Sequence, residues 1–467
     1  MDWVEQEFKS IDIGDKRLNK RATKVLKSFI GNPEQSIPST FQSWSETKAV
    51  YRFFDNPSVT PKKLLKPHQV ATLERIKAHP TVLLIEDTSS LNYSGQLARK
   101  DIGPLQQNNV RGLFIHPMLA VTPDRVCLGI LSYEQWSRDE LTEDAKFRKE
   151  KRRAQPIYQK ESYRWLKGYK KAEYLSKSFP DKNFVYIADR EGDIYEIFQQ
   201  SSKSTAPNNA QWIIRSTYDR SVVDEDAKKK RNKLRAMVKA SQPIGQIKFT
   251  LPADKARKPR EVTQTVYAKE VTLNAPYGKE QKGHAAVRVS VVIATEDNPP
   301  LGEDPIEWVL LTSMDVNTIE SALTVIQYYL CRWQIELFFK ILKSGCQIEK
   351  LQLNDEHRFN PCLTMYMVVA WRVLYLTMMG RATPDSNCEL VFEPNEWKTA
   401  YAVIHKKPPP KKPPTIKSAL KMIAQLGGFL ARKSDGEPGN KVIWKGLQAL
   451  HHYIQAHEAF AAMHNLN

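Results

Sequence analysis

The 467-residue chain has few cysteines, and their spacing builds neither a metal cluster nor a disulfide framework. The cysteines are five, an odd number, and no two of them form a Cys-x-x-Cys pair, which argues against a zinc ribbon and a disulfide-stapled secreted fold. They are Cys127, Cys331, Cys346, Cys362 and Cys388. We therefore expect buried or reduced thiols in a cytoplasmic protein.

The sequence also lacks an uninterrupted apolar run long enough to cross a membrane. The nearest candidate, Leu363–Met379, is short and carries Arg372 in its middle, so we interpret it as a core helix. Acidic and basic residues are mixed from Asp2 onward, so no secretory leader is expected. We expect no membrane partner.

Acidic residues are outnumbered by basic ones. The chain has 70 Lys and Arg against 52 Asp and Glu, a formal charge of +18, and its isoelectric point is near 9.4. Such a surplus favours a polyanionic partner and salt-sensitive binding, without separating DNA from RNA or an anionic membrane. A hydrophobic fraction of 41% is sufficient for packed cores. The length predicts about two to four domains.

Two apolar, β-rich runs each end in a carboxylate. Thr81–Asp87 reads TVLLIED, and the run that begins at Asn183 ends in Asp189. Each is typical of a buried strand with an acid at its carboxyl end, where open α/β sheets place their sites. Each aspartate is also consistent with a simple cap of the next helix.

A third cluster of chemically active side chains is Tyr329-x2-Arg332-x3-Glu336-x6-Lys343. At roughly 100° per residue these four share a stripe about 60° wide on one helix face, with Lys340 beside it. One acid among cations and a hydroxyl suits a divalent metal held next to a phosphate backbone. The same face also fits a solvated helix with ordinary ion pairs between residues four apart.

Together, Asp87, Asp189 and Glu336 supply three hard oxygen ligands from separate elements. Such a set can hold two Mg²⁺ ions about 4 Å apart, which activates the attacking oxygen and stabilises the leaving oxygen of a phosphoryl displacement. Mn²⁺ is expected to substitute. Glu86 and Asp193 are rival carboxylates. Strand alternation turns Glu86 away from the face of Asp87, and Asp193 is expected inside the following helix.

The order of the predicted elements indicates the fold. Strands are expected at Thr81–Asp87, Leu113–Thr122, Arg125–Tyr133, the Asp189 run and Gln211–Arg215. Helices are expected at about Glu140–Ser178, ended by Pro180, and at Glu191–Gln200. This order of three strands, helix, strand, helix, strand is that of an RNase H-like nuclease core. The interval from about 216 to 308 alternates in β fashion and predicts an inserted subdomain, with strands at Gly245–Leu251, Glu261–Leu273 and Ala285–Glu296.

The two ends of the chain look helical. Asp15–Ile30 has a clean apolar stripe, and its other side is basic, which fits either a DNA-reading helix or a solvated face. Near the other end, His405–Pro414 is a basic polyproline stretch that predicts a linker or exposed loop able to touch phosphates. Amphipathic helices are expected after it at Thr415–Ala431 and Lys441–His464.

These blocks resemble the DDE transposases of bacterial insertion sequences, in the insertion-sequence-four group. The signature of that group, Tyr-x2-Arg-x3-Glu-x6-Lys, is matched without a gap from Tyr329 to Lys343. The segments around Asp87 and Asp189 are similar to those around the group's first and second catalytic aspartates. Shorter echoes extend the resemblance over nearly the whole chain, at Ala49–Phe53, Asn56-Pro57 and Leu426–Phe429.

The resemblance implies an α/β fold: an RNase H-like catalytic core with an inserted β subdomain, flanked by an N-terminal helical DNA-binding domain and a C-terminal helical domain. The expected bounds are 1–62, 63–382 and 383–467. The first domain would grip the transposon end and the last would form a homodimer in the DNA complex, although a helical cap without a partner also fits the C-terminal pattern.

The implied activity is cut-and-paste transposition of double-stranded DNA through a hairpin at the transposon end. Asp87, Asp189 and Glu336 would be the catalytic metal ligands. The implied DNA-contacting residues are Tyr329, Arg332, Lys340, Lys343, Trp308, Trp333, Arg215, Arg52, Lys16, Arg17, Lys20, Arg21 and Lys24. Trp308 would hold an unstacked base, with plain packing of both tryptophans as the alternative. Two other functions stay open: a structure-specific nuclease without strand transfer, and a catalytically silent DNA-binding inhibitor of transposition.

Overall fold

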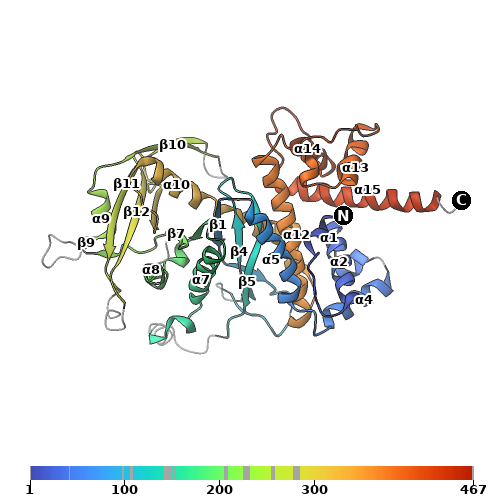
Figure 1. The fold of residues 1–467 in the computed structure, drawn as a ribbon, viewed down its shortest axis with the longest axis horizontal. Helices are drawn as coiled ribbons and strands as arrows, with labels where there is room; N and C mark the ends of the chain where they lie inside the picture. Colours follow the sequence, from blue (N-terminus) through green and yellow to red (C-terminus); the bar gives the residue numbers. More distant parts are fainter. Residues whose placement is uncertain are drawn as a thin grey trace. The chain divides into compact units, whose positions relative to one another are not determined.

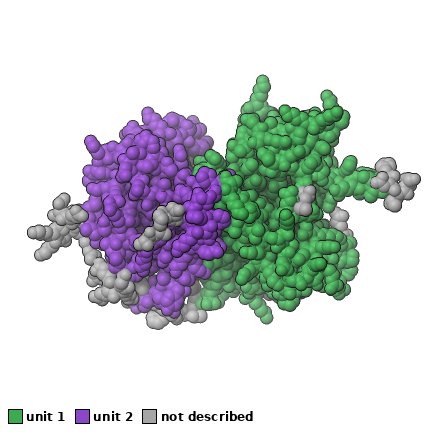
Figure 2. All heavy atoms as spheres, in the orientation of Figure 1, with its two compact units in different colours: residues 1–78, 88–141, 334–467 green, residues 79–87, 142–333 purple. Residues whose placement is uncertain are grey.

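The chain forms two compact units in a computed structural model that describes residues 2–41, 43–96, 99–105, 109–140, 150, 154–204, 209–223, 232–253, 258–276 and 284–464. Unit 1 comprises residues 1–78, 88–141 and 334–467, and unit 2 comprises residues 79–87 and 142–333 (Figure 2). Each unit is therefore assembled from segments that are distant in the sequence.

Unit 2 is built on a mixed sheet. Three parallel strands come first, β1 (Thr81–Glu86), β6 (Asn183–Ala188) and β7 (Gln211–Arg215). The sheet then continues antiparallel from β7 through β13 (Glu307–Thr312), β12 (Val287–Glu296) and β11 (Arg260–Leu273). The shorter strands β10 (Gly245–Leu251) and β8 (Ser221–Val222) pair with β11, and β9 (Asn232–Lys233) pairs with β8.

The parallel strands are buried because their sequences are apolar on both faces. All residues of β1 after Thr81 are buried, and so are all residues of β6 after Asn183. The inserted strand β11 instead alternates between buried and more exposed positions over most of its length, as expected for a strand with one solvated face. The predicted strands of the core and of the insertion are thus confirmed to within a few residues.

Two predicted helices of unit 2 are shorter than expected. The helix over Glu140–Ser178 is not continuous: Glu150 and Ala154 are helical, the chain then leaves the helix and forms the turn η1 (Ile157–Gln159), and α7 spans Tyr163–Ser178; 141–149 and 151–153 lie outside the described residues. The helix over Glu191–Gln200 begins late, since a 3-10 turn, η2 (Arg190–Gly192), precedes α8 (Tyr195–Ser202). Charge-rich composition alone did not reveal these breaks. Unit 2 also contains the helices α9 (Leu234–Lys239) and α10 (Ile319–Leu330).

Unit 1 is mainly helical and surrounds one long helix, α12 (Glu356–Ala382; Figure 1). Its N-terminal helices are α1 (Trp3–Glu7), α2 (Lys16–Gly31), α3 (Ile37–Phe41), α4 (Trp44–Asp55) and α5 (Pro61–Lys77). Its strands are β2 (Ser89–Asn92), β3 (Gly103–Pro104), β4 (Arg111–Val121) and β5 (Cys127–Trp136). After α12 come the turn η6 (Cys388–Leu390), α13 (Pro394–His405), α14 (Ile416–Leu426) and α15 (Asn440–His464). The helix predicted from Asp15 is α2, with Asp15 as its N-cap.

Helix α12 is a core helix, as the sequence indicated. Among the described residues it is the one helix long and apolar enough to span a membrane by length and composition, but 89% of its apolar window is buried inside the protein. It packs against α2, α4, α5 and β5. Arg372 lies on its buried side, where it donates to the carbonyl of Val391 and stacks on the ring of Trp3 at 4.5 Å.

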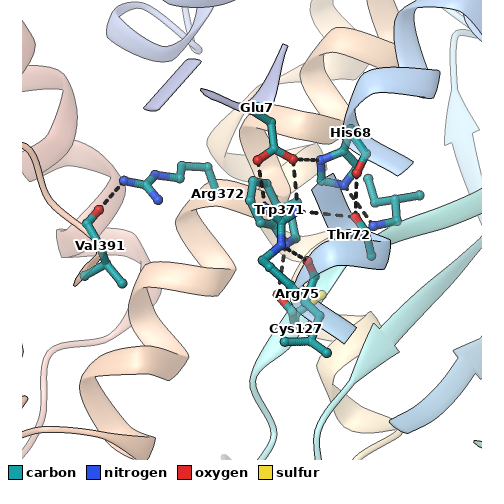
Figure 3. Close-up of polar contacts among 10 residues, drawn as sticks. Glu7, His68, Thr72, Arg75, Cys127, Trp371, Arg372 and Val391 are labelled. Carbon is teal, nitrogen blue, oxygen red and sulfur yellow. Dashed lines mark hydrogen bonds and ion pairs between the residues drawn. The ribbon is translucent and has the colours of Figure 1, made fainter. Parts of the chain in front are cut away.

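A buried polar network fixes α1 to the rest of unit 1 (Figure 3). The carboxylate of Glu7 accepts two hydrogen bonds from Arg75, of 2.8 and 2.9 Å, and pairs with Nδ1 of His68. Nε2 of His68 accepts the backbone N–H of Ile130 at 2.9 Å, so Nδ1 carries the proton that is donated to Glu7. Arg75 also lies over the ring of Trp371 at 4.4 Å. The network therefore joins α1, α5, β5 and α12.

The C-terminal helices pack closely on one another because two glycines line their contact. A Cβ on Gly446 of α15 would lie 1.8 Å from the carbonyl oxygen of Ile423, and one on Gly427 would lie 2.0 Å from that of Val442. Gly427 therefore has a packing role within the Leu426–Phe429 block. The five cysteine thiols are all buried, and none forms a disulfide, which confirms the expected buried thiols.

Candidate catalytic site and DNA-contacting residues

The two predicted catalytic aspartates occupy equivalent positions at the ends of neighbouring parallel strands of unit 2. Ile85 of β1 is paired with Ile187 of β6, and Asp87 and Asp189 each follow two residues later. Adjacent strands lie about 4.8 Å apart, so this register sets both carboxylates at one edge of the sheet. Asp189 also caps the η2 turn, because its Oδ1 accepts the N–H of Glu191 at 2.8 Å. The Asp189 carboxylate therefore caps the turn, and a role as metal ligand would use the same carboxylate.

The residue before Asp87 points into a different environment. Glu86 is 3% exposed, and its Oε2 accepts the hydroxyl of Tyr186 on β6 at 2.8 Å. Gly168 of α7 leaves room for this carboxylate, since a Cβ there would lie 1.9 Å from the same Oε2. The expected turn of Glu86 away from the face of Asp87 fits this placement. Glu86, Tyr186 and Gly168 thus clamp the strand ends that carry the two aspartates.

Asp193 is not inside a helix, contrary to the prediction. It ends the η2 turn, with φ −72° and ψ 65°, and is 3% exposed, and Ile194 separates it from the start of α8. Its Oδ2 accepts the N–H of Thr217 at 2.8 Å, and its Oδ1 accepts a hydrogen bond from Arg220. Asp193 therefore holds the loop that leaves β7, and its carboxylate is saturated by these partners.

Arg332 contacts the first aspartate directly. Its Nη1 lies 2.7 Å from Oδ2 of Asp87, and the two side chains are 15% and 17% exposed. Tyr329 precedes it by three residues and is 6% exposed, and burial raises the pKa of its hydroxyl against the opposing charges of Arg332 and Arg215. Within unit 2 the structure thus groups Asp87, Arg332, Tyr329 and Arg215.

A pocket of about 320 Å³ lies beside Trp308 in unit 2. Trp308 is half-buried and packs edge-on against Tyr329, with 6.4 Å between the ring centroids. Two acids line the pocket, Asp304 and Glu307, and Glu307 is paired with Arg235. The cations lining it are Arg190, Arg215 and Arg235. Only Arg215 was expected. Arg190 could have been found from its position next to Asp189, whereas Arg235 lies in the insertion and carries no sequence signal.

The signature does not lie on one regular helix. Helix α10 ends at Leu330, a turn occupies Cys331 and Arg332, and α11 spans Trp333–Lys340. A π-helical turn, η4 (Ile341–Gly345), then widens the helix. The predicted single stripe is therefore wrong in detail, because a count of 100° per residue assumes an unbroken α-helix.

The last two signature residues belong to unit 1. Glu336 lies in the first turn of α11, one helical turn after Arg332 in the sequence, and is partly exposed. Lys340 is exposed, while Lys343 on η4 is half-buried, and burial lowers its pKa against the opposing charge of Glu349. Unit 2 alone thus groups two of the three predicted carboxylates.

The remaining predicted DNA contacts differ in exposure. Trp333 is 55% exposed, so packing in the core does not account for it. On α2, Lys16, Arg17, Lys20 and Lys24 are exposed and Arg21 is half-buried. Lys24 is paired with Glu46. Arg52 is exposed on α4.

The chemistry of the two aspartates suits Mg²⁺, which prefers carboxylate oxygens. Within the described residues, however, no group of three or more His, Cys, Asp or Glu side chains is placed to hold a metal ion. Asp87 is held instead by Arg332, and the third predicted ligand belongs to the other unit. The carboxylates of unit 2 are therefore of the type that binds a divalent cation, but unit 2 contains only two of the three predicted ligands.

A second pocket, of about 920 Å³, lies in unit 1 and does not suit a phosphate. Four carboxylates line it, and Asp55 among them is already paired with Arg358. The other three are Asp101, Asp355 and Glu356. Lys100 and His357 also line the pocket, but the four acids outnumber them, so we place no DNA site there.

Comparison with known proteins gives three consecutive family matches. Residues 1–59 match the transposase DNA-binding family, 158–368 the transposase DDE domain and 368–463 the Tn5 transposase dimerisation domain. Among solved structures, the chain is similar to a piggyBac transposase synaptic complex with hairpin DNA, at 9% identity and a TM-score of 0.32, covering 84% of this chain and 78% of that one.

These matches account for the mixed α/β core between two helical regions and for the basic charge. Divalent metal dependence is implied by the DDE family, and DNA is implied as a partner by the DNA-binding match. Along the chain the matched segments follow in the order DNA-binding, DDE domain and dimerisation domain. The chain belongs to the DDE transposases and resembles the transposase of Tn5.

Proposed function

We propose that this transposase excises its element through a DNA hairpin and joins the freed 3′-hydroxyl ends to target DNA. The observation that carries the proposal is the register of β1 and β6, which sets Asp87 and Asp189 side by side with Arg332 bound to Asp87. This is an acidic centre with a phosphate-binding cation next to it, the combination that phosphoryl transfer requires.

The proposed metal ligands are Asp87, Asp189 and Glu336, which would hold two Mg²⁺ ions, with Mn²⁺ as a substitute. When bound, the ions supply activation of the attacking oxygen and stabilisation of the leaving oxygen. The clamp of Glu86, Tyr186 and Gly168 keeps the two strand ends in register. The two aspartates have different partners: Asp189 accepts a hydrogen bond within the η2 turn, and Asp87 is paired with Arg332.

Arg332 has two roles in this proposal. Its guanidinium neutralises Asp87 and presents further donors to a phosphate of the transposon end. Lys340 and Lys343 would hold neighbouring phosphates as point charges, and the partial burial of Lys343 strengthens such a contact by excluding water. Tyr329 would donate to a phosphate near the distorted end.

The pocket beside Trp308 is the proposed place for an unstacked base. A tight hairpin needs at least one base to leave the stack, and an aromatic wall can hold it. Trp308 supplies that wall, and Arg190 and Arg215 would contact the adjoining phosphates, whereas Arg235 is paired with Glu307 of the same lining. The exposed ring of Trp333 is available for a second contact with DNA.

The steps use one kind of displacement throughout. Water nicks one strand, the new 3′-hydroxyl attacks the opposite strand to form the hairpin, a second water opens it, and the 3′-hydroxyl then attacks target DNA. Each step is an in-line attack that forms one P–O bond and breaks another, with the 3′-oxygen of a DNA strand as the leaving group, so a single site serves all four. We assign end binding to residues 1–62, catalysis to 63–382 and homodimerisation on DNA to 383–467, in a cytoplasmic protein.

The test is strand transfer between two plasmids, one carrying the element ends. Wild-type protein should give joined products, and Asp189→Asn, which keeps the size of the side chain, should give none. The matched control is Asp181→Asn in the same unit, since Asp181 is 69% exposed and should leave transfer unchanged. Cleavage without joined products would favour the structure-specific nuclease. DNA binding without cleavage would favour the silent inhibitor.

A further inference from the structure

The segment Lys406–Pro414, called here the lysine–proline loop, joins α13 to α14 and contains only lysine and proline. Four lysines stand in two pairs, Lys406-Lys407 and Lys411-Lys412, separated by three prolines. All four are exposed, and the structure gives none of them an ion pair within the described residues. The loop therefore concentrates four uncompensated positive charges in nine residues.

The loop is anchored at both ends. Helix α13 stops at His405 because Lys406 adopts a left-handed conformation, with a φ of 53°, and its N–H still bonds to the carbonyl of Ala402 at 2.9 Å. At the other end the carbonyl of Pro414 accepts the N–H of Cys388 at 3.0 Å, and Thr415 forms a β-bridge with Asn387. Cys388 is buried in the core of the C-terminal helices.

The prolines make the loop stiff. Each fixes its φ near −65° and removes a backbone donor, and a residue before proline is restricted to extended conformations. The lysine stems therefore project from a backbone that has little freedom left to lose on binding. An ordinary charged linker would lose more conformational entropy on binding than this loop.

We propose that the lysine–proline loop binds the phosphate backbone of duplex DNA without regard to sequence, and that this DNA is the target. The inference rests on the proposed function for the identity of the target. Lysine is a point charge without the planar fork by which arginine reads guanine, and proline offers no N–H to a base edge. The loop thus carries phosphate-binding groups and lacks base-reading ones.

The experiment compares two full-length variants of equal charge. The loop variant changes Lys406, Lys407, Lys411 and Lys412 to Gln. The control changes four exposed lysines of the same C-terminal region to Gln, Lys421, Lys433, Lys441 and Lys445. Equilibrium binding to a random-sequence duplex is measured over a range of salt concentrations. Strand transfer of a pre-cleaved end is then measured at varied concentrations of target plasmid.

The loop variant should bind the random duplex more weakly. The slope of the logarithm of its binding constant against the logarithm of the salt concentration should be shallower by about one for each lysine that binds a phosphate. Its half-saturating target concentration should rise several-fold, with the maximal rate unchanged. Equal behaviour of the loop and control variants would overturn the proposal, and so would a selective loss of binding to the element's end. Absence of strand transfer in the wild type would refute the proposed function instead, while the random-duplex arm would still test the loop.

Discussion

Replacing Glu7 with glutamine should strongly destabilise unit 1, because it discharges the buried network of Figure 3. Burial alone would raise the pKa of Glu7, but the interactions and hydrogen bonds that its carboxylate makes with His68 and with the guanidinium of Arg75 overcome it and hold the pKa at about 2, below the ordinary 4.5. A difference of that size corresponds to about 3 kcal/mol of stability. Breaking a buried ion pair from one side costs about 3–5 kcal/mol, which agrees.

The pH dependence gives the sign of the effect. Since the folded pKa of Glu7 is depressed, its contribution is fully present above pH 4.5 and is lost as the pH falls from 4.5 toward 2. Burial also lowers the pKa of His68 from its ordinary 6.5, so the folded protein keeps this histidine neutral. Its contribution to stability is therefore present above pH 6.5 and is lost progressively as the pH falls below 6.5. The Glu7→Gln variant already lacks the carboxylate and should lose less stability on acidification than the wild type.

Urea unfolding of the full chain at neutral pH and at pH 4 measures both effects. Glu5→Gln is the matched control, because Glu5 lies on the same helix, is 46% exposed and pairs with Lys27 at 2.8 Å. Its loss should stay below about 1 kcal/mol. Equal losses in the Glu7 and Glu5 variants, or the same acid sensitivity in the Glu7 variant as in the wild type, would refute the reasoning.

Three further predictions concern unit 2 and the thiols. Gly168→Ala should push against Glu86 and raise the Mg²⁺ concentration needed for half-maximal cleavage, whereas unchanged Mg²⁺ dependence in a folded variant would argue against the clamp. Asp193→Ala should lower the melting temperature, by leaving Arg220 unpaired, yet retain cleavage in the folded fraction, whereas Asp189→Ala should keep the melting temperature and abolish cleavage. Equal loss of cleavage in both, with folding intact, would overturn that assignment. The five buried cysteines should react with a thiol reagent only after denaturant is added, and fast reaction of the native chain would contradict their burial.

Much of the fold could be predicted from the sequence because its elements carry strong local patterns. The apolar runs before Asp87 and Asp189, the alternation of β11 and the stripe of α2 all match their elements closely. Each pattern reflects the regular spacing of buried side chains along a helix or strand, which can be read directly from the local sequence. The pairing of β1 with β6, in contrast, depends on long-range register, which no local pattern expresses.

The failures arose where tertiary contacts decide local structure. The sequence around Asp193 is typical of the start of a helix, but the Asp193 carboxylate instead accepts hydrogen bonds from Arg220 and from the backbone N–H of Thr217 in a loop. The break at Cys331 and Arg332 is invisible in a segment whose residues all tolerate helix, and Arg332 is paired with Asp87 at this break. Arg235 joins the pocket beside Trp308 from a separate helix, which no motif could reveal.

The most direct test of the central claim uses a labelled duplex of the element's own terminus joined to flanking DNA. It is incubated with Mg²⁺ and either wild-type protein or Glu336→Ala, and the products are separated on a denaturing gel. The account predicts a slowly migrating hairpin on the flank-free fragment with wild-type protein and none with the variant. Nicked strands without any hairpin, or a hairpin that persists in the Glu336 variant, would contradict it.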